Sequence, residues 1–189
     1  MKTTEFLIYE HRLILRALDV LDEMALAVQE GDAVDKTDIA VILHFLRSFA
    51  DAHHQAMEER ILFPALKAAA RSQQRTVDHM ALEHGQERAL IEEMENNLRL
   101  AKLSEFADCA NKLSSTLRNH IYKEDHILFE TVDAVLSVRE DDAVVEELRA
   151  FDNTSGEVLQ SEITSLRRLE WKYLRRSRYR TTGADHGTN

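Results

Sequence analysis

Cysteine, proline and glycine are scarce in this chain of 189 residues, which has one cysteine, one proline and five glycines. A single cysteine excludes an intrachain disulfide framework and favours a reducing compartment. So few prolines and glycines exclude an all-β fold, because its many tight turns need both residue types. The abundance of Ala, Leu, Glu and Arg instead predicts an all-α protein.

Long apolar runs and several catalytic motifs are also absent. No stretch approaches the ~20 apolar residues of a membrane span, and the N-terminus lacks the apolar run of a signal peptide. Without a Gly-rich phosphate loop, a nucleophile elbow or a Cys-x-x-Cys motif, phosphoryl and acyl transfer have no support. We therefore predict a soluble, cytoplasmic protein with no membrane partner.

The charge is strongly acidic overall but unevenly spread. A net charge of −10 argues against nucleic-acid binding by the chain as a whole. Residues 166–180 nevertheless carry a local charge of +6, interspersed with Trp171, Tyr173 and Tyr179. We expect this basic segment to dock on the acidic remainder, or on a second copy as a homodimer through the C-terminal helix. A nucleic-acid or membrane partner is the less favoured alternative.

Apolar residues recur at helical spacing over most of the chain. The pattern predicts helices over about 4–29, 37–70, 76–100, 104–137 and 142–178, the last interrupted at Asn153–Gly156. Pro64 should kink the second helix near Arg60 or open a shorter terminal piece. A polar break is expected at Arg139–Asp142. The expected N-caps are Thr37, Thr76 and Ser104.

Long helices with short connections favour an up-down-up-down antiparallel four-helix bundle with an additional C-terminal helical segment. We predict that residues 1–138 form the bundle. Residues 139–180 should form a helical extension that packs on the bundle or on a partner, and residues 181–189 a disordered tail.

One motif occurs twice, 66 positions apart. The stretches 54–64 and 120–130 each contain His-x-x-x-Glu, then a second carboxylate, and then Ile-Leu-Phe. Residues four apart lie on one face of an α-helix, so each copy offers an imidazole beside a carboxylate. That face should be largely apolar and interior, where unpaired charge is costly. The repeat therefore predicts a metal site, built on His54 with Glu58 and His120 with Glu124.

The other histidines and the spacing narrow the kind of metal site. A single histidine among the nine is more often an ordinary surface or core residue, but the duplicated pair and the Glu-His dipeptides at 10–11 and 83–84 favour a shared site. Nitrogen and oxygen ligands suit iron or manganese better than a closed tetrahedral zinc site. Two carboxylates can bridge two metals. Ferritin-like bundles use Glu-x-x-His instead, which argues against that class.

These motifs, in this order, resemble those of hemerythrin-like proteins, the HHE cation-binding domain. The resemblance extends over roughly residues 4–137 and includes His11, both copies of the repeat, and Glu83-His84 with Arg88. It implies a four-helix bundle around two non-haem iron ions, with manganese or zinc as alternatives. The implied ligands are His11, His54, Glu58, His84, His120 and Glu124, with both glutamates bridging.

The third helix departs from the oxygen-carrying hemerythrins, which have two histidines there, spaced by four. Met80 and Arg88 occupy the two positions four away from His84, and His79 is about 140° round the helix. Both metals then fall short of six ligands, unless Tyr9, Glu10, His79 or Glu83 fills a position. An open position on each metal suits reactivity or sensing better than simple oxygen carriage.

The residues beside the implied ligands receive plainer interpretations. Glu59 and Asp125 are expected to be solvated or to orient a ligand histidine. His53 is expected on the surface or behind a ligand, and Cys109 as a small core residue.

The sequence thus predicts a non-haem di-iron protein that binds or reacts with a small molecule such as dioxygen, peroxide or nitric oxide. Its role would be sensing, detoxification or iron handling. The alternative is a helical interaction or regulatory protein with a structural metal site and a basic C-terminal partner-binding helix.

Overall fold

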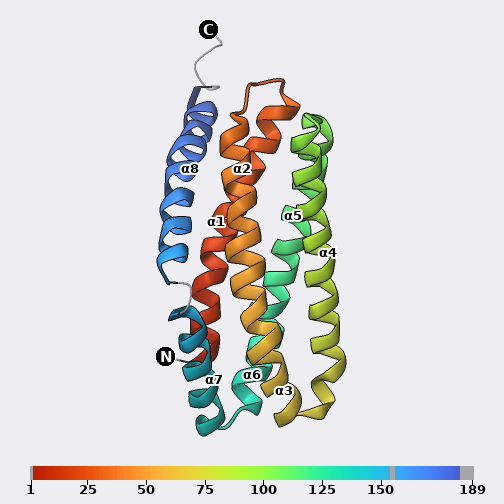
Figure 1. The fold of residues 1–189 in the computed structure, drawn as a ribbon, viewed down its shortest axis with the longest axis vertical. Helices are drawn as coiled ribbons and strands as arrows, with labels where there is room; N and C mark the ends of the chain where they lie inside the picture. Colours follow the sequence, from red (N-terminus) through yellow and green to blue (C-terminus); the bar gives the residue numbers. More distant parts are fainter. Residues whose placement is uncertain (1, 154–155, 184–189) are drawn as a thin grey trace.

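The computed structural model describes residues 2–153 and 156–183, with the backbone alone for 156–158 and 176–183, and this part of the chain is helical without strands. The all-α bundle is therefore confirmed. Figure 1 shows long rods lying alongside one another, with the connections between them at the two ends of the molecule.

The rods follow the chain in order. The first is α1 (Thr3–Gln29), and the second joins α2 (Lys36–Phe45), η1 (Leu46–Gln55), η2 (Glu58–Leu62) and α3 (Phe63–Ala69). A short 3₁₀ turn, η3 (Arg71–Gln73), leads into α4 (Gln74–Arg99). The fourth rod joins α5 (Leu103–Lys123), η4 (Glu124–Leu128) and α6 (Phe129–Val135). The extension consists of α7 (Val138–Asn153) and α8 (Gly156–Gly183).

Three stretches of the second and fourth rods are π-helical, where the sequence predicted unbroken α-helix. They are η1, η2 and η4. Both copies of the repeated motif begin a π-helical stretch at their glutamate, Glu58 in η2 and Glu124 in η4. A π-turn widens the helix and occurs frequently at functional sites. This local widening accompanies the repeat in both rods.

Several predicted helix starts were wrong by a few residues. Asp35 caps α2, because its side chain accepts a hydrogen bond from the backbone N–H of Thr37 at 2.8 Å. Thr76 and Ser104 lie inside the first turns of α4 and α5. Pro64 lies at the start of α3, as the shorter-piece alternative predicted.

The polar break expected at Arg139–Asp142 is instead the first turn of α7. Ser137 and Glu140 form a reciprocal cap: the backbone N–H of Ser137 donates to the Glu140 carboxylate at 2.8 Å, and that of Glu140 donates to the Ser137 hydroxyl at 3.4 Å. Ser-x-x-Glu is the sequence signature of such a cap. The interruption predicted at Asn153–Gly156 includes residues 154–155, which lie outside the described part; α7 ends at Asn153 and α8 begins at Gly156.

The apolar core is divided into two clusters by a layer of buried polar side chains. Along α1, Leu7 belongs to one cluster and Leu13 to the other, with His11 between them. Along α4, Met80 and Leu90 flank His84 in the same way. The rods therefore bring their polar residues to one depth in the bundle.

The extension packs against one side of the bundle. Contacts join α7 to α1 and η2, and α8 to α1 and α2. The buried carboxylate of Asp38 accepts a hydrogen bond from the Tyr173 hydroxyl at 2.9 Å and pairs with Arg168 at 3.0 Å and with Lys172. The described part of the basic segment thus docks on its own chain. The homodimer stays a prediction.

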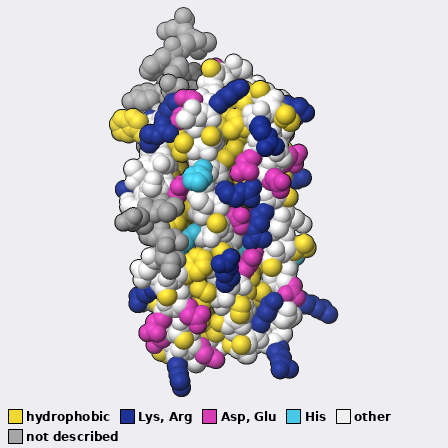
Figure 2. All heavy atoms as spheres, in the orientation of Figure 1, with side chains coloured by type: hydrophobic (Ala, Val, Ile, Leu, Met, Phe, Trp, Pro, Cys, Tyr) yellow, Lys and Arg dark blue, Asp and Glu magenta, His cyan; other side chains and the backbone are white. Residues whose placement is uncertain are grey.

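Two further expectations concern the ends and surface of the chain. Helix α8 continues to Gly183, so residues 181–183 of the expected disordered tail are helical, and residues 184–189 lie outside the described part. None of the helices described here is long and apolar enough to cross a membrane. Figure 2 shows acidic and basic side chains interspersed over one face of the molecule.

Candidate metal centre

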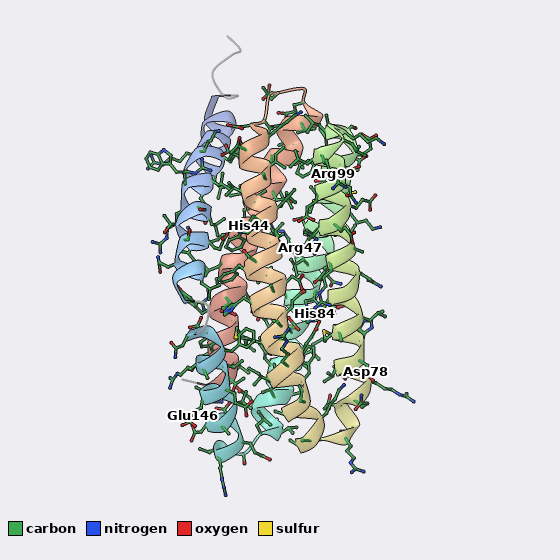
Figure 3. All side chains as sticks on the ribbon, in the orientation of Figure 1. His44, Arg47, Asp78, His84, Arg99 and Glu146 are labelled. Atoms are coloured by element: carbon green, nitrogen blue, oxygen red, sulfur yellow. The ribbon has the colours of Figure 1, made fainter. Side chains whose placement is uncertain are left out.

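Six side chains from four rods converge in the polar layer, and each was among the predicted site residues. None of the six residues is more than 2% exposed, and Figure 3 labels one of them, His84 of α4. They are His11 of α1, His54 of η1, Glu58 of η2, His84 of α4, His120 of α5 and Glu124 of η4.

The six side chains form two sets of possible metal donors that share both glutamates. One set adds His11 and His54 to Glu58 and Glu124, and the other adds His84 and His120 to the same two carboxylates. Within each set all donor atoms lie within 4.8 Å of one another. This sharing is the arrangement that two carboxylate-bridged ions require.

The spacing of the donor atoms suits metal ions. The two oxygens of Glu58 lie 3.5 Å from Nε2 of His54 and 3.4 Å from Nε2 of His84. Oε2 of Glu124 lies 3.3 Å from Nε2 of His11 and 3.2 Å from Nε2 of His120. Ligands bound at about 2.1 Å lie about 3.0 Å apart in an octahedron and about 3.4 Å apart in a tetrahedron.

The inward-facing atoms are polar, buried and without hydrogen-bond partners. This holds for Nε2 of His11 and of His54 and for both carboxylate oxygens of Glu58 and Glu124. Buried polar atoms in native proteins are normally paired, because leaving them unpaired costs about 1–3 kcal/mol each. A cation between them supplies the missing partner. The donor set therefore fits metal binding on its own chemistry.

The two imidazoles of the second donor set also indicate that a proton or a cation lies between the donor atoms. Nε2 of His84 lies 3.0 Å from Nε2 of His120. Two imidazole lone pairs repel at that distance unless a proton or a metal ion lies between them. Burial lowers the pKa of His120, but the charges of Glu124, Glu87 and Glu58 raise it more, to about 10. A metal ion must displace that proton, so affinity falls as pH falls.

Four carboxylates fix the outer nitrogens of these histidines. Each imidazole has its Nδ1 within hydrogen-bond distance of a carboxylate from a different rod. The partners are Glu10 for His54 (2.8 Å), Glu59 for His84 (2.8 Å), Glu83 for His120 (2.9 Å) and Asp125 for His11 (2.6 Å). A hydrogen on Nδ1 leaves the Nε2 lone pair for a metal, and such carboxylates orient metal-binding histidines.

These pairings close a ring around the bundle. Each orienting carboxylate is the sequence neighbour of one of the six central residues, and each rod orients the histidine of the next rod, with the last returning to α1. Glu59 and Asp125 thus orient histidines, the second of the two roles expected for them. The phenylalanine of each copy of the repeat also contacts a central histidine. Phe63 stacks on His84 at 5.7 Å and Phe129 stacks on His11 at 5.4 Å between ring centroids.

The four residues considered as extra ligands lie elsewhere. Tyr9 is 58% exposed, and the exposed His79 places its Nε2 3.2 Å from the Glu83 carboxylate. Glu10 and Glu83 stand behind histidines rather than among the inward-facing atoms. None of the four belongs to either donor set. His53 is buried with its Nε2 2.9 Å from Glu10, behind a central histidine as one alternative expected.

Sequence reasoning missed a buried pair next to the centre. Gln55 donates a hydrogen bond to Oε2 of Glu87 at 2.6 Å, and Glu87 is 1% exposed. Burial raises the pKa of Glu87 to about 7, although the charge of His120 and the bond from Gln55 oppose the rise. The only sequence signal is its position three residues after His84, on the same face of α4.

The fold and the site together define a class of protein, an all-α bundle with a buried cation-binding centre of histidines and glutamates. Comparison with protein families agrees: residues 2–132 match the model of the hemerythrin HHE cation binding domain. The chain belongs to this family. No curated protein and no solved structure matches the chain.

Proposed function

We propose that this chain is a non-haem di-iron protein that binds or reacts with a small molecule such as dioxygen, peroxide or nitric oxide. Its role would be sensing, detoxification or iron handling. The observation that carries the proposal is the pair of donor sets that share Glu58 and Glu124. Two ions held that close by common carboxylates act as one unit.

Iron is the favoured metal because of the donors. Each set offers two imidazoles and two carboxylates, and nitrogen and oxygen donors with further positions to fill suit iron or manganese. Each ion would have four protein donors, fewer than the six of an octahedron. Bound iron would supply the redox chemistry and the positions at which the small molecule binds. Manganese and zinc remain the alternatives that metal analysis separates.

The surroundings of the centre favour a small, weakly polar ligand. The central residues are at most 2% exposed, and the aromatic rings of Phe63 and Phe129 cover His84 and His11. A large or strongly hydrated molecule would have to give up its water to reach the metals. Dioxygen and nitric oxide are weakly hydrated, so they lose little hydration free energy on entering such surroundings.

The alternative of an interaction protein has less support. Its partner site would be the basic C-terminal helix, but Arg168 and Lys172 pair with Asp38 of the same chain. Trp171 is 63% exposed with the Arg175 guanidinium 3.4 Å over its ring, which leaves a smaller surface for a partner.

The test combines metal analysis with absorption spectroscopy. The purified protein should hold two irons per chain, and its near-ultraviolet charge-transfer bands should change on addition of peroxide or nitric oxide. The Glu58→Ala, Glu124→Ala double variant should purify without iron. The matched control is Glu130→Ala, an exposed glutamate of α6, which should keep both irons. Two irons in the double variant would show that the bridging assignment is wrong.

A further inference from the structure

A second group of metal-ligating side chains lies outside the centre, where α7 crosses α1 and η1. It consists of Glu10, His53 and Asp152, whose donor atoms all lie within 4.8 Å of one another. Nε2 of His53 is 2.9 Å from Oε1 of Glu10 and 3.6 Å from Oδ1 of Asp152. These separations bracket the value of about 3.4 Å expected for tetrahedral zinc ligands.

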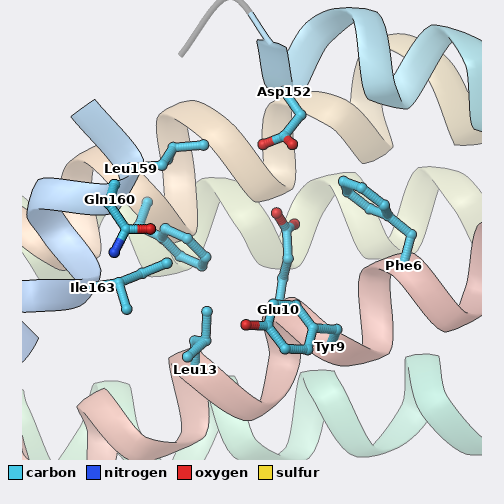
Figure 4. A pocket seen from close by; sticks show the side chains of 9 residues that line it. Phe6, Tyr9, Glu10, Leu13, Asp152, Leu159, Gln160 and Ile163 are labelled. Atoms are coloured by element: carbon cyan, nitrogen blue, oxygen red, sulfur yellow. The ribbon is translucent and has the colours of Figure 1, made fainter. Parts of the chain in front are cut away.

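A cavity of about 230 Å³ adjoins this group. Figure 4 shows Glu10 rising from α1 and Asp152 descending from α7, with their carboxylates pointing toward one another across it. The walls are mainly apolar and include Phe6, Leu13 and Leu159. Since one water takes about 30 Å³, the cavity has room for a cation and the waters that complete its coordination.

The charges at this cavity are unbalanced. Glu10 is 5% exposed and Asp152 is about half-buried, so two carboxylates face each other in a partly apolar place. Within the described part of the chain, no lysine or arginine pairs with either of them, and His53 is their only shared partner. Burial and the charge of Glu10 raise the pKa of Asp152, although His53 opposes the rise. A divalent cation would remove the repulsion between the carboxylates.

We infer that Glu10, His53 and Asp152 hold a third divalent cation, of the zinc or manganese type, with one imidazole, two carboxylates and water as ligands. Three protein ligands plus water is a common arrangement for zinc. Asp152 lies beyond residues 2–132, which match the family, so this site depends on the C-terminal extension. It does not rest on the proposed di-iron function.

The site would be coupled to the central metals through one side chain. Glu10 uses Oε1 toward His53 and Oε2 toward Nδ1 of His54. A cation on Oε1 withdraws charge from the carboxylate that orients His54. The third ion would therefore tune the half of the centre that contains His54, while the cavity keeps it open to exchange with solvent.

The test is equilibrium dialysis of the metal-free protein against zinc, followed by metal analysis of the full chain. The wild type should bind three ions and Asp152→Asn two, with the dissociation constant of the third ion raised at least about tenfold. Glu147→Gln, an exposed carboxylate on the same helix, is the matched control and should bind three.

A second comparison of variants distinguishes ion binding at the central site from ion binding at the third site. Glu58→Ala, Glu124→Ala should bind one ion, and adding Asp152→Asn should leave none. Three ions in Asp152→Asn, or only two in the wild type, would overturn the third site without affecting the proposed function. Should the central variant fail to fold, the comparison of wild type with Asp152→Asn still decides, since Asp152 is partly exposed and its loss leaves no cavity.

Discussion

The two halves of the candidate metal centre use the same ligand types but differ in what supports them. Behind His84 and His120, the orienting carboxylates Glu59 and Glu83 contact Arg88 and Lys123. Behind His54, Glu10 contacts the imidazole of His53 instead. In the described part of the chain, neither Glu10 nor the carboxylate behind His11 pairs with a lysine or arginine.

This difference teaches that a duplicated motif need not produce equivalent metal positions. A cation behind a carboxylate takes up part of its charge, so less reaches the histidine that the carboxylate orients. The hydrogen bond from His84 lowers the pKa of Glu59, and so do the hydrogen bond and the charge of Arg88. Burial opposes them, and the resulting pKa is about 2. We therefore expect the ion between His11 and His54 to be the more electron-rich of the two.

The two halves of the centre also differ in which helices pack over them. The extension packs on α1 and on the second rod, which carry His11 and His54, while α4 and α5 pack on each other. One half thus lies under α7 and α8, which are outside the region that matches the family. Changes in the extension should therefore act on one half first.

The largest expected effect is the loss of the ion from one half of the centre while the other half keeps its ion. His84→Ala with His120→Ala should reduce the iron content of the centre from two ions to one, because that half loses both nitrogen donors. His11→Ala with His54→Ala should do the same for the other half. Metal analysis by atomic emission checks both, with the exposed His79→Ala as the control on α4. If either pair removes both ions, the halves do not bind independently.

A smaller effect should appear when an orienting carboxylate becomes an amide. Glu59→Gln and Asp125→Asn keep the shape of the side chain but remove its charge, which typically costs about 10–100-fold in metal affinity. The loss should be greater for Asp125→Asn, because Glu59 already shares its charge with Arg88. Competition with a chelator measures both affinities. Equal losses would argue that the supporting cations have no influence.

The smallest expected effect on the centre comes from loosening the extension. Asp38→Asn removes the charge that holds Arg168 and Lys172, and hydrogen bonds to a charged group contribute about 1.5–3 kcal/mol. For a chain of this size that loss lowers the melting temperature by about 3–12 °C. Both ions should stay bound. The check is a thermal melt followed by circular dichroism, beside metal analysis.

The difference in melting temperature between the wild type and Asp38→Asn should depend on pH in a definite direction. Burial raises the pKa of Asp38, but hydrogen bonds from Lys172, Tyr173 and Arg168 lower it more, to below its ordinary value. The carboxylate therefore stabilises the fold fully above the ordinary value of about 3.9, and the gain is lost as pH falls through the lower folded value. The melting temperatures of wild type and Asp38→Asn should converge in acid. A gap that persists there would rule out the carboxylate charge as its cause.

The sequence alone was enough to predict the helical bundle and the six residues that converge. Apolar spacing along each rod predicts the bundle, and the repeated His-x-x-x-Glu motif predicts four of the six residues. His11 and His84 were implied by the resemblance to hemerythrin-like proteins. Spacing along one helix places His54 and Glu58 on adjoining turns whatever the partner rods do. That these six residues bind iron stays a prediction.

Tertiary structure alone decided the support around them. His11 meets Asp125 across 114 positions of sequence, and His53 of η1 meets Glu10 of α1 and Asp152 of α7. Such pairs depend on the rotation and depth at which rods pack, which no local pattern in one sequence specifies. The π-helical starts at Glu58 and Glu124 were also visible only in the structure, although they accompany the repeated motif in both rods.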